Sequence, residues 1–141
     1  MTSPDSIDLR EVIFINERCR KDYFDLPEDV CETADQAIDA LQNGRQLPPK
    51  MFTKLGGGLS GIDEIRIPYD TDTYRVYVMQ EWKWVIIVVG AEMKKSTSGN
   101  NIPKDQVERL EARLKKARAY VKDNSHLLER DFLKREARRN A

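Results

Sequence analysis

The sequence has little of what metal-dependent or disulfide-bonded proteins need. It contains one histidine, His126, and two cysteines, Cys19 and Cys31, among 141 residues. Metal-dependent nucleases hold their ions with clusters of carboxylates or histidines, and no acidic motif here has ligand spacing, so we expect no metal and no other cofactor. No apolar run reaches membrane-spanning length, and the N-terminus shows no signal peptide. These absences predict a reduced, cytoplasmic protein with no membrane association.

A net charge is also missing, because 24 basic residues balance 24 acidic ones. The balance hides an asymmetry along the chain. Residues 1–42 carry four basic and eleven acidic side chains, a net charge of −7, whereas residues 104–141 carry twelve basic and seven acidic ones, a net charge of +5. A polyanion would therefore bind the middle and the C-terminal half of the chain rather than its N-terminal helices. The alternative is that both ends are solvated helix surfaces.

Three β-branched, hydrophobic segments follow one another in the middle of the chain, at residues 62–67, 74–79 and 84–89. β-Branched and aromatic residues favour strands, and the polar connections between the segments have hairpin lengths, so we expect three consecutive antiparallel strands. The third segment is apolar at every position, as in a central strand covered on both faces. An earlier strand is expected at residues 11–15.

Alternation along the strands assigns their residues to two faces. In the first of the three strands Ile65 and Ile67 share one face, and Glu64 and Arg66 point the other way. In the second strand Arg75 and Tyr77 lie opposite a face made of Tyr74, Val76 and Val78.

Apolar residues three and four positions apart predict the helices. We expect helices at residues 17–24, from Pro27 to residue 42, from Pro103 to residue 122, and at residues 126–139 after a break at residues 123–125. The resulting order β-α-α-β-β-β-α is an α+β arrangement. We therefore predict one domain over residues 1–122, with a loose lead-in at residues 1–9, and a basic helical extension over residues 123–141.

Three blocks of sequence carry a family resemblance when their order and spacing are taken together. They are residues 55–66 (LGGGLSGIDEIR), residues 74–76 (YRV) and residues 94–99 (KKSTSG), the last followed by Pro103. This set resembles the RelE-like toxins, specifically the phage-derived HigB branch. Residues 26–30 and 42–44 also fall where that family has similar residues.

The resemblance implies the toxin of a type II toxin–antitoxin pair. Such toxins inhibit translation by cleaving mRNA, usually in the ribosomal A site, and a helix-turn-helix antitoxin neutralises them. The implied fold is a four-stranded, mostly antiparallel sheet with packed helices. The chain departs from the family in two respects. Glu92 replaces a frequent phenylalanine two positions before the paired lysines. Some members use a histidine in the site, whereas the only histidine here, His126, lies in the extension from about Asp123, which is itself beyond the usual family end.

Metal-free RNA cleavage uses the neighbouring 2′-hydroxyl as nucleophile and needs a proton acceptor, a proton donor and cations around the phosphate. Arg66 and Arg75 suit the phosphate, because a guanidinium binds two oxygens and stays charged. Lys94 or Lys95, surrounded by other cations, would transfer protons. The further candidates are Tyr77 and Glu92 for proton transfer or for orienting a base, and Lys50, Lys54, Trp82, Arg109 and Arg113 for binding RNA.

Three other interpretations stay open from the sequence. The candidate charges are also explained as solvent-facing side chains paired with Asp63, Glu64 or Glu92. A ParE-like poison of DNA gyrase on the same scaffold would stop replication without cutting RNA. A catalytically silent binding protein would keep the fold and the partner. The paired lysines after the last strand favour the nuclease, and Glu92 leaves room for the silent binding protein.

Overall fold

The sheet has five strands, one more than the sequence predicts. The computed structural model describes residues 8–94 and 102–141, and its strands lie in the order β1-β5-β4-β3-β2. β1 runs parallel to β5, and all other neighbouring pairs are antiparallel. The strands are β1 (Glu11–Phe14), β2 (Phe52–Lys54), β3 (Ile62–Tyr69), β4 (Asp72–Met79) and β5 (Val85–Lys94). The helices are α1 (Glu17–Phe24), α2 (Glu28–Gln42), the 3-10 turn η2 (Gly57–Leu59) and α3 (Lys104–Arg139).

The unpredicted strand is β2, which has three residues in a stretch rich in turn-forming residues. Local sequence does not mark it as a strand, because it forms by pairing with β3. Phe52 lies opposite Ile65, and the Arg66 amide donates a hydrogen bond of 2.7 Å to the Met51 carbonyl. The expected α+β class is confirmed, and the expected number of strands is wrong by this one edge strand.

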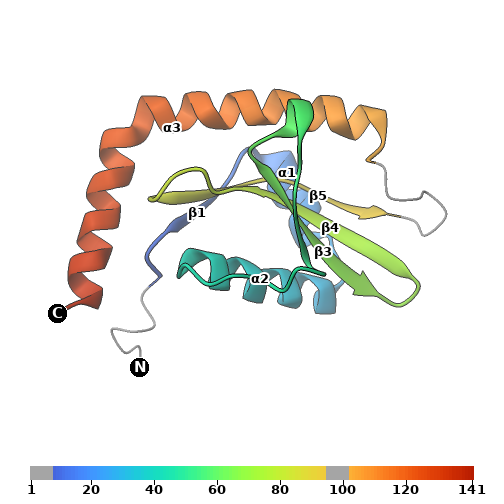
Figure 1. Ribbon diagram of the computed structural model, residues 1–141, viewed down its shortest axis with the longest axis horizontal. Coiled ribbons are helices and arrows are strands. Elements are labelled where there is room, and N and C mark those ends of the chain that lie inside the picture. The colour runs from blue at the N-terminus through green and yellow to red at the C-terminus, as the bar shows by residue number, and fades with distance from the viewer. Residues whose placement is uncertain (1–7, 95–101) are drawn as a thin grey trace.

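The sheet separates two layers of helices, with α1 and α2 on one face and α3 on the other (Figure 1). β5 lies between β1 and β4, and its residues Val85 to Val89 have no exposed surface. A strand buried on both faces reads as a continuous apolar run, so the prediction of a central strand at this segment is confirmed.

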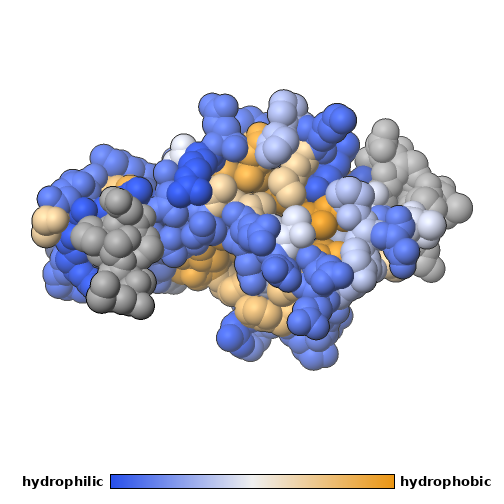
Figure 2. Space-filling model, turned by 90° about the horizontal axis from the view of Figure 1, so that it is seen from below, coloured by the Kyte–Doolittle hydropathy of each residue, from blue (hydrophilic) through white to orange (hydrophobic). Residues whose placement is uncertain are grey.

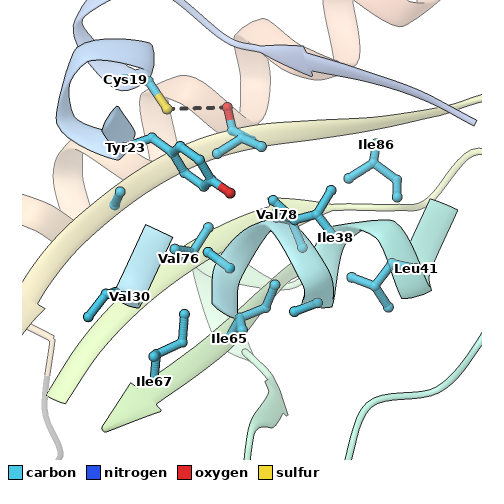
Figure 3. Close-up of a cluster of buried hydrophobic side chains, with 14 residues drawn as sticks. Cys19, Tyr23, Val30, Ile38, Leu41, Ile65, Ile67, Val76, Val78 and Ile86 are labelled. Carbon is cyan, nitrogen blue, oxygen red and sulfur yellow. Dashed lines mark hydrogen bonds between the residues drawn. The ribbon is translucent and has the colours of Figure 1, made fainter. Parts of the chain in front are cut away.

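The core against α1 and α2 is almost entirely apolar. Figure 3 shows Cys19 and Tyr23 of α1 facing the sheet, with the Cys19 thiol donating to the Val88 carbonyl at 3.3 Å. Burial raises the pKa of this thiol to about 11, so Cys19 stays a neutral packing residue. The remaining labelled residues are Val30, Ile38 and Leu41 of α2 and Ile65, Ile67, Val76, Val78 and Ile86 of the sheet.

The C-terminal segment continues α3, which runs without interruption from Lys104 to Arg139, so the predicted break at residues 123–125 is wrong. Figure 1 shows instead that the helix bends in its C-terminal half. Asn124 and Ser125 lie in that half and hydrogen-bond to the carbonyls of Tyr120 and Lys122. Such side-chain bonds to the preceding turn compete with the helix backbone and bend helices.

Beyond these residues α3 is attached to the rest of the protein by specific contacts. Phe132 is buried under the Lys83 ammonium, at 5.5 Å from the ring centroid. Arg135 donates to the Leu9 carbonyl at 2.8 Å, and Arg139 donates to the Asn43 side chain at 3.1 Å. These contacts hold residues 8–10 and the C-terminal end of α2 against the last helix.

Candidate functional site

The strand register brings three predicted site residues into one row. Arg66 of β3 lies opposite Arg75 of β4, and Arg75 lies opposite Glu92 of β5. The neighbouring row contains Glu64, Tyr77 and Gly90. Tyr77 packs in the core beneath α3, and alternation places the polar residues of both rows on that same face. The face opposite α1 and α2 therefore carries a polar cluster made of Glu64, Arg66, Arg75, Tyr77 and Glu92.

Glu64 joins the two arginines of this polar cluster. Its Oε1 atom lies 2.5 Å from Arg66 Nε, and its Oε2 atom lies 3.4 Å from Arg75 Nε. The side chains of Glu64 and Arg75 are 2% and 1% exposed, whereas that of Arg66 is 38% exposed. Two cations directly opposite each other on a sheet repel, and the carboxylate between them removes that repulsion. Glu64 therefore anchors Arg75 inside the protein and holds Arg66 at the surface.

Tyr77 and Glu92 form the second half of the cluster. The Tyr77 hydroxyl donates a hydrogen bond of 2.5 Å to Glu92 Oε1. Burial and the adjacent Glu92 carboxylate raise the pKa of Tyr77 far above its usual value, so Tyr77 stays protonated and acts as a donor. Burial also raises the pKa of Glu92, although the Tyr77 hydrogen bond and the charge of Arg75 offset part of the rise.

The first turns of α3 close one side of the cluster. Gly90 makes this approach possible, because a Cβ atom there would lie 3.1 Å from Leu110 and 3.2 Å from a ring carbon of Tyr77. Gln106 is buried beside Gly90 and accepts a hydrogen bond of 2.6 Å from Arg109. The helix thus covers Tyr77 and leaves Arg66 and part of Glu92 open to solvent.

With this geometry established, comparison with known families identifies the chain. It matches the family described as "Phage derived protein Gp49-like (DUF891)" over residues 21–115, more than half of its length. The chain belongs to the Gp49-like family. This is a RelE-like toxin family of toxin–antitoxin systems, associated in general with ribonuclease-type toxin activity, so membership implies an antitoxin partner. Placement in the HigB branch stays a prediction. A search of curated proteins finds no match.

The matched region of this Gp49-like protein contains the whole polar cluster and ends in the first third of α3. In the described parts of the chain, no group of three or more His, Cys, Asp or Glu side chains is arranged to hold a metal ion. Over the same residues, no helix combines the length and the apolar character needed to cross a membrane.

The other predicted site residues lie outside the polar cluster or outside the residues that the structure describes. Lys94 ends β5 with its backbone opposite Thr73, and Lys95 lies outside the described residues. Trp82 packs against the core beneath α3 at the β4–β5 connection, beyond the C-terminal end of β4, whereas Arg75 lies in the middle of that strand. Arg113 is buried and donates to the Val89 carbonyl at 2.8 Å, so it fastens α3 to the sheet.

Three of the predicted RNA-binding residues are exposed. Arg109 lies on the first turns of α3, where its guanidinium bonds to Gln106. Lys50 lies in the turn before β2, and Lys54 is the last residue of β2. The two lysines therefore lie at the edge of the sheet next to β3, and Arg109 lies on the part of α3 beside the polar cluster.

Sequence reasoning missed two residues that shape the site. The sequence offers Glu64 as one possible partner of solvent-facing charges, whereas it is buried and bridges both arginines. Its role depends on the register of β3 against β4, which alternation alone does not give. Gln106 was not singled out, because its burial results from the close approach of α3 to Gly90.

Proposed function

We propose that this Gp49-like protein is the toxin of a type II toxin–antitoxin pair and acts as a metal-independent, ribosome-dependent mRNA endonuclease that blocks translation. The observation that carries the proposal is the exposed guanidinium of Arg66, held by the buried Glu64 on the same face as the Tyr77–Glu92 pair. Arg66 and Glu92 lie in one row on this face, two strands apart with Arg75 between them. The fixed cation offers a group for the phosphate, and the carboxylate with a raised pKa offers a group for the proton.

In the proposed reaction the 2′-hydroxyl attacks the adjacent phosphorus, and its proton passes to the Glu92 carboxylate. Arg66 stabilises the negative charge that develops on the phosphate oxygens. The 5′-oxygen leaves after taking a proton, and Lys94 or Lys95 is the candidate donor from the sequence. The products are a 2′,3′-cyclic phosphate and a free 5′-hydroxyl.

Arg75 and Tyr77 serve this chemistry from inside the protein. Arg75 is 1% exposed and Tyr77 has no exposed surface, so neither reaches an RNA chain directly in this conformation. Arg75 holds Glu64, which in turn orients Arg66, and Tyr77 orients Glu92. We therefore assign Arg75, Glu64 and Tyr77 as positioning residues and Arg66 and Glu92 as catalytic residues.

Induced expression followed by mapping of RNA 5′ ends tests the proposal. The wild-type chain is expected to generate cuts inside translated messages, and Arg66→Ala is expected to reduce them by about 10² to 10³-fold, as for loss of a charge-stabilising group. Arg18→Ala is the matched control, because Arg18 is an exposed arginine of α1 that also pairs with a carboxylate, Asp22. Cuts that persist in Arg66→Ala at the level of the control would overturn the assignment.

A second candidate function, a catalytically silent binding protein, is favoured by one observation. Tyr77 occupies one oxygen of Glu92, and burial of Arg75 removes one of the two predicted phosphate cations from the surface. This candidate predicts an antitoxin complex without RNA cuts and without arrest of growth. DNA-damage signalling without RNA cuts would instead indicate the ParE-like action on gyrase.

The partner in the proposal is a helix-turn-helix antitoxin. If it neutralises the nuclease by binding this chain, co-expression with the product of a neighbouring reading frame restores growth and yields a co-purifying complex. A neighbouring gene product that restores growth without forming a complex would contradict direct neutralisation.

A further inference from the structure

A cavity of about 470 Å³ lies on the opposite face of the sheet from the polar cluster, beside β2. Figure 2 views this face, and apolar residues appear there on either side of a hydrophilic band that follows α2. One of these apolar areas belongs to the cavity, which the loop after α2, strand β2 and residue Arg10 enclose. Nothing in the proposed cleavage chemistry uses this cavity.

Three cations from separate parts of the chain line the cavity: Arg10, Arg45 and Lys54. Within the described residues no salt bridge joins any of them to a carboxylate. Asp63 lies directly opposite Lys54 in the β2–β3 register and accepts a hydrogen bond of 3.0 Å from Gln80, and Arg45 influences Asp39. Neither carboxylate lines the cavity. The cavity is therefore a concentration of positive charge, which an anion would neutralise.

Arg10 is positioned rather than free to move. Its Nη1 atom donates to Gln80 at 3.2 Å, and its backbone carbonyl accepts a hydrogen bond of 2.8 Å from the Gln42 side chain. It is partly removed from water, and that desolvation lowers its pKa. A cation held in this way, with further donors left on its guanidinium, is suited to bind a phosphate group.

Beside the cations and the side chains of Gln46 and Gln80, the cavity wall has an apolar part that includes one aromatic ring. Leu41, Leu47 and Phe52 line it together with Pro49. Phe52 is half-buried, with its backbone paired to Ile65 and its side chain packed against the core beneath α2. Single-stranded nucleic acids bind by combining a cationic track for the phosphates with aromatic faces on which bases stack.

We propose that this cavity binds one nucleotide of single-stranded RNA, with its phosphate among Arg10, Arg45 and Lys54 and its base against Phe52. The inference rests on the proposed ribonuclease function and adds a second contact with the RNA chain away from the cleavage chemistry. It also gives Lys54, predicted from the sequence to bind RNA, a specific place in the structure.

The edge of the sheet connects this cavity with the polar cluster. β2 is the outermost strand and has only three residues, and its preceding residue Met51 accepts the hydrogen bond from the Arg66 amide. Arg66 extends to one face, whereas Phe52 belongs to the other. An RNA strand that passes round this edge would meet Arg66, then the exposed Lys50, then the cavity.

Titration of the full chain with small probes tests the cavity directly. The probes are uridine 5′-monophosphate, uridine and inorganic phosphate, and amide and side-chain NMR shifts report binding. We expect the mononucleotide to bind more tightly than either uridine or phosphate and to shift Phe52 and Lys54. Arg45→Gln or Lys54→Gln is expected to weaken binding about tenfold, equivalent to about 1.4 kcal/mol. The matched control is Lys122→Gln, because Lys122 is an exposed lysine of α3.

Three outcomes would overturn the proposal. One is equal affinity of Arg45→Gln, Lys54→Gln and the Lys122→Gln control. A second is equal affinity for inorganic phosphate and the mononucleotide, since Phe52 would then contribute nothing. A third is binding of an acidic peptide in the cavity with no response to the mononucleotide.

Binding of a short single-stranded RNA to the Arg66→Ala variant separates this inference from the proposed function. In this background we expect Lys54→Gln to weaken RNA binding and to reduce the slope of log affinity against log salt concentration by about 0.7, one phosphate contact. An unchanged slope overturns the cavity as an RNA site even if the wild type cleaves RNA. A reduced slope, together with an absence of RNA cuts by the wild type, supports the cavity and overturns only the cleavage.

Discussion

The two faces of the sheet use alternate residues of the same strands and treat charge in opposite ways. Towards α1 and α2, β3 and β4 present Ile65, Ile67, Val76 and Val78, and the layer closes as an apolar core. Towards α3 the same two strands present Glu64, Arg66, Arg75 and Tyr77. Burying an apolar side chain is favourable at any position, whereas burying a charge is tolerated only with a partner in place. The charged face therefore depends on which residues lie directly opposite each other, whereas the apolar face needs only the alternation that keeps its residues on one side of the sheet.

The largest effect is expected when the bridging carboxylate is removed. Glu64→Gln removes the negative charge that faces the Nε atom of the buried Arg75 guanidinium. We expect the free energy of unfolding to fall by about 3 to 5 kcal/mol. Urea denaturation monitored by circular dichroism measures the change. RNA cleavage should fall as well, because Arg66 loses the residue that orients it.

A double variant distinguishes a cost of lost charge pairing from a cost of lost packing. Glu64→Leu combined with Arg75→Met makes this part of the charged face resemble the apolar face, and we expect most of the lost stability to return. Cleavage should stay low, because Arg66 remains unsupported. If the double variant is as unstable as Glu64→Gln, the difference between the two faces does not lie in charge pairing.

The next largest effect concerns the close approach of α3 to the charged face. Gly90→Ala adds a Cβ atom 3.1 Å from Leu110 and 3.2 Å from Tyr77. We expect this overpacking to lower the free energy of unfolding by about 1 to 3 kcal/mol. Thermal unfolding measures it. Gly56→Ala is the control, because a Cβ atom there meets nothing within 4 Å. Equal unfolding temperatures for the two variants would show that the helix does not press on the sheet at Gly90.

Two tyrosines on opposite sides of the sheet make equivalent hydrogen bonds, so their substitution allows a direct comparison of the two sides. Tyr23 donates to Asp35 and Tyr77 donates to Glu92, each at 2.5 Å. Asp35 is exposed, so water replaces the tyrosine hydroxyl as its hydrogen-bond donor in the variant. We therefore expect Tyr23→Phe to lower the free energy of unfolding by about 0.5 to 1.5 kcal/mol. Glu92 is half-buried, so Tyr77→Phe is expected to cost about 1 to 3 kcal/mol.

Cleavage assays extend the comparison of the tyrosines to function. Tyr77→Phe should shift the pH profile of RNA cleavage, because it removes the donor that orients Glu92, while Tyr23→Phe should leave the profile unchanged. Equal effects of the two substitutions on stability and on the profile would contradict a special role for the α3 face.

The same contrast explains how much the sequence alone could predict. Alternation in residues 62–67 and 74–79 correctly separated Ile65 and Val76 from Arg66 and Arg75, because one face must be apolar. The bridge made by Glu64 and the burial of Gln106 were not predictable, since they depend on register and on the approach of α3. The short β2 escaped notice because only its pairing with β3 makes it a strand. Residues 123–125 look like a helix break, yet the contacts of Phe132 and Arg135 keep the helix continuous through a bend.

The smallest expected effect is on the pH dependence of stability. Burial raises the pKa of Glu92, so the folded state holds this proton more tightly than the unfolded state does. Stability is therefore greatest while Glu92 is protonated in both states, falls as the pH rises from the ordinary glutamate pKa through the raised one, and stays lower above it. Glu92→Gln should remove this decline and leave the protein more stable at pH 7, with the amide oxygen still accepting from Tyr77.

Urea denaturation across pH 4 to 8 measures this difference, with Glu108→Gln as the control at an exposed carboxylate of α3. Burial also raises the pKa of Asp63. In the Glu92→Gln variant, stability should therefore still decline slightly as the pH rises, because Asp63 still loses its proton. A decline in Glu92→Gln as steep as in the wild type would show that Glu92 is not the group whose desolvation opposes folding. A gain in stability together with loss of cleavage would indicate that the charged face retains this carboxylate for chemistry, since the fold is more stable without its charge.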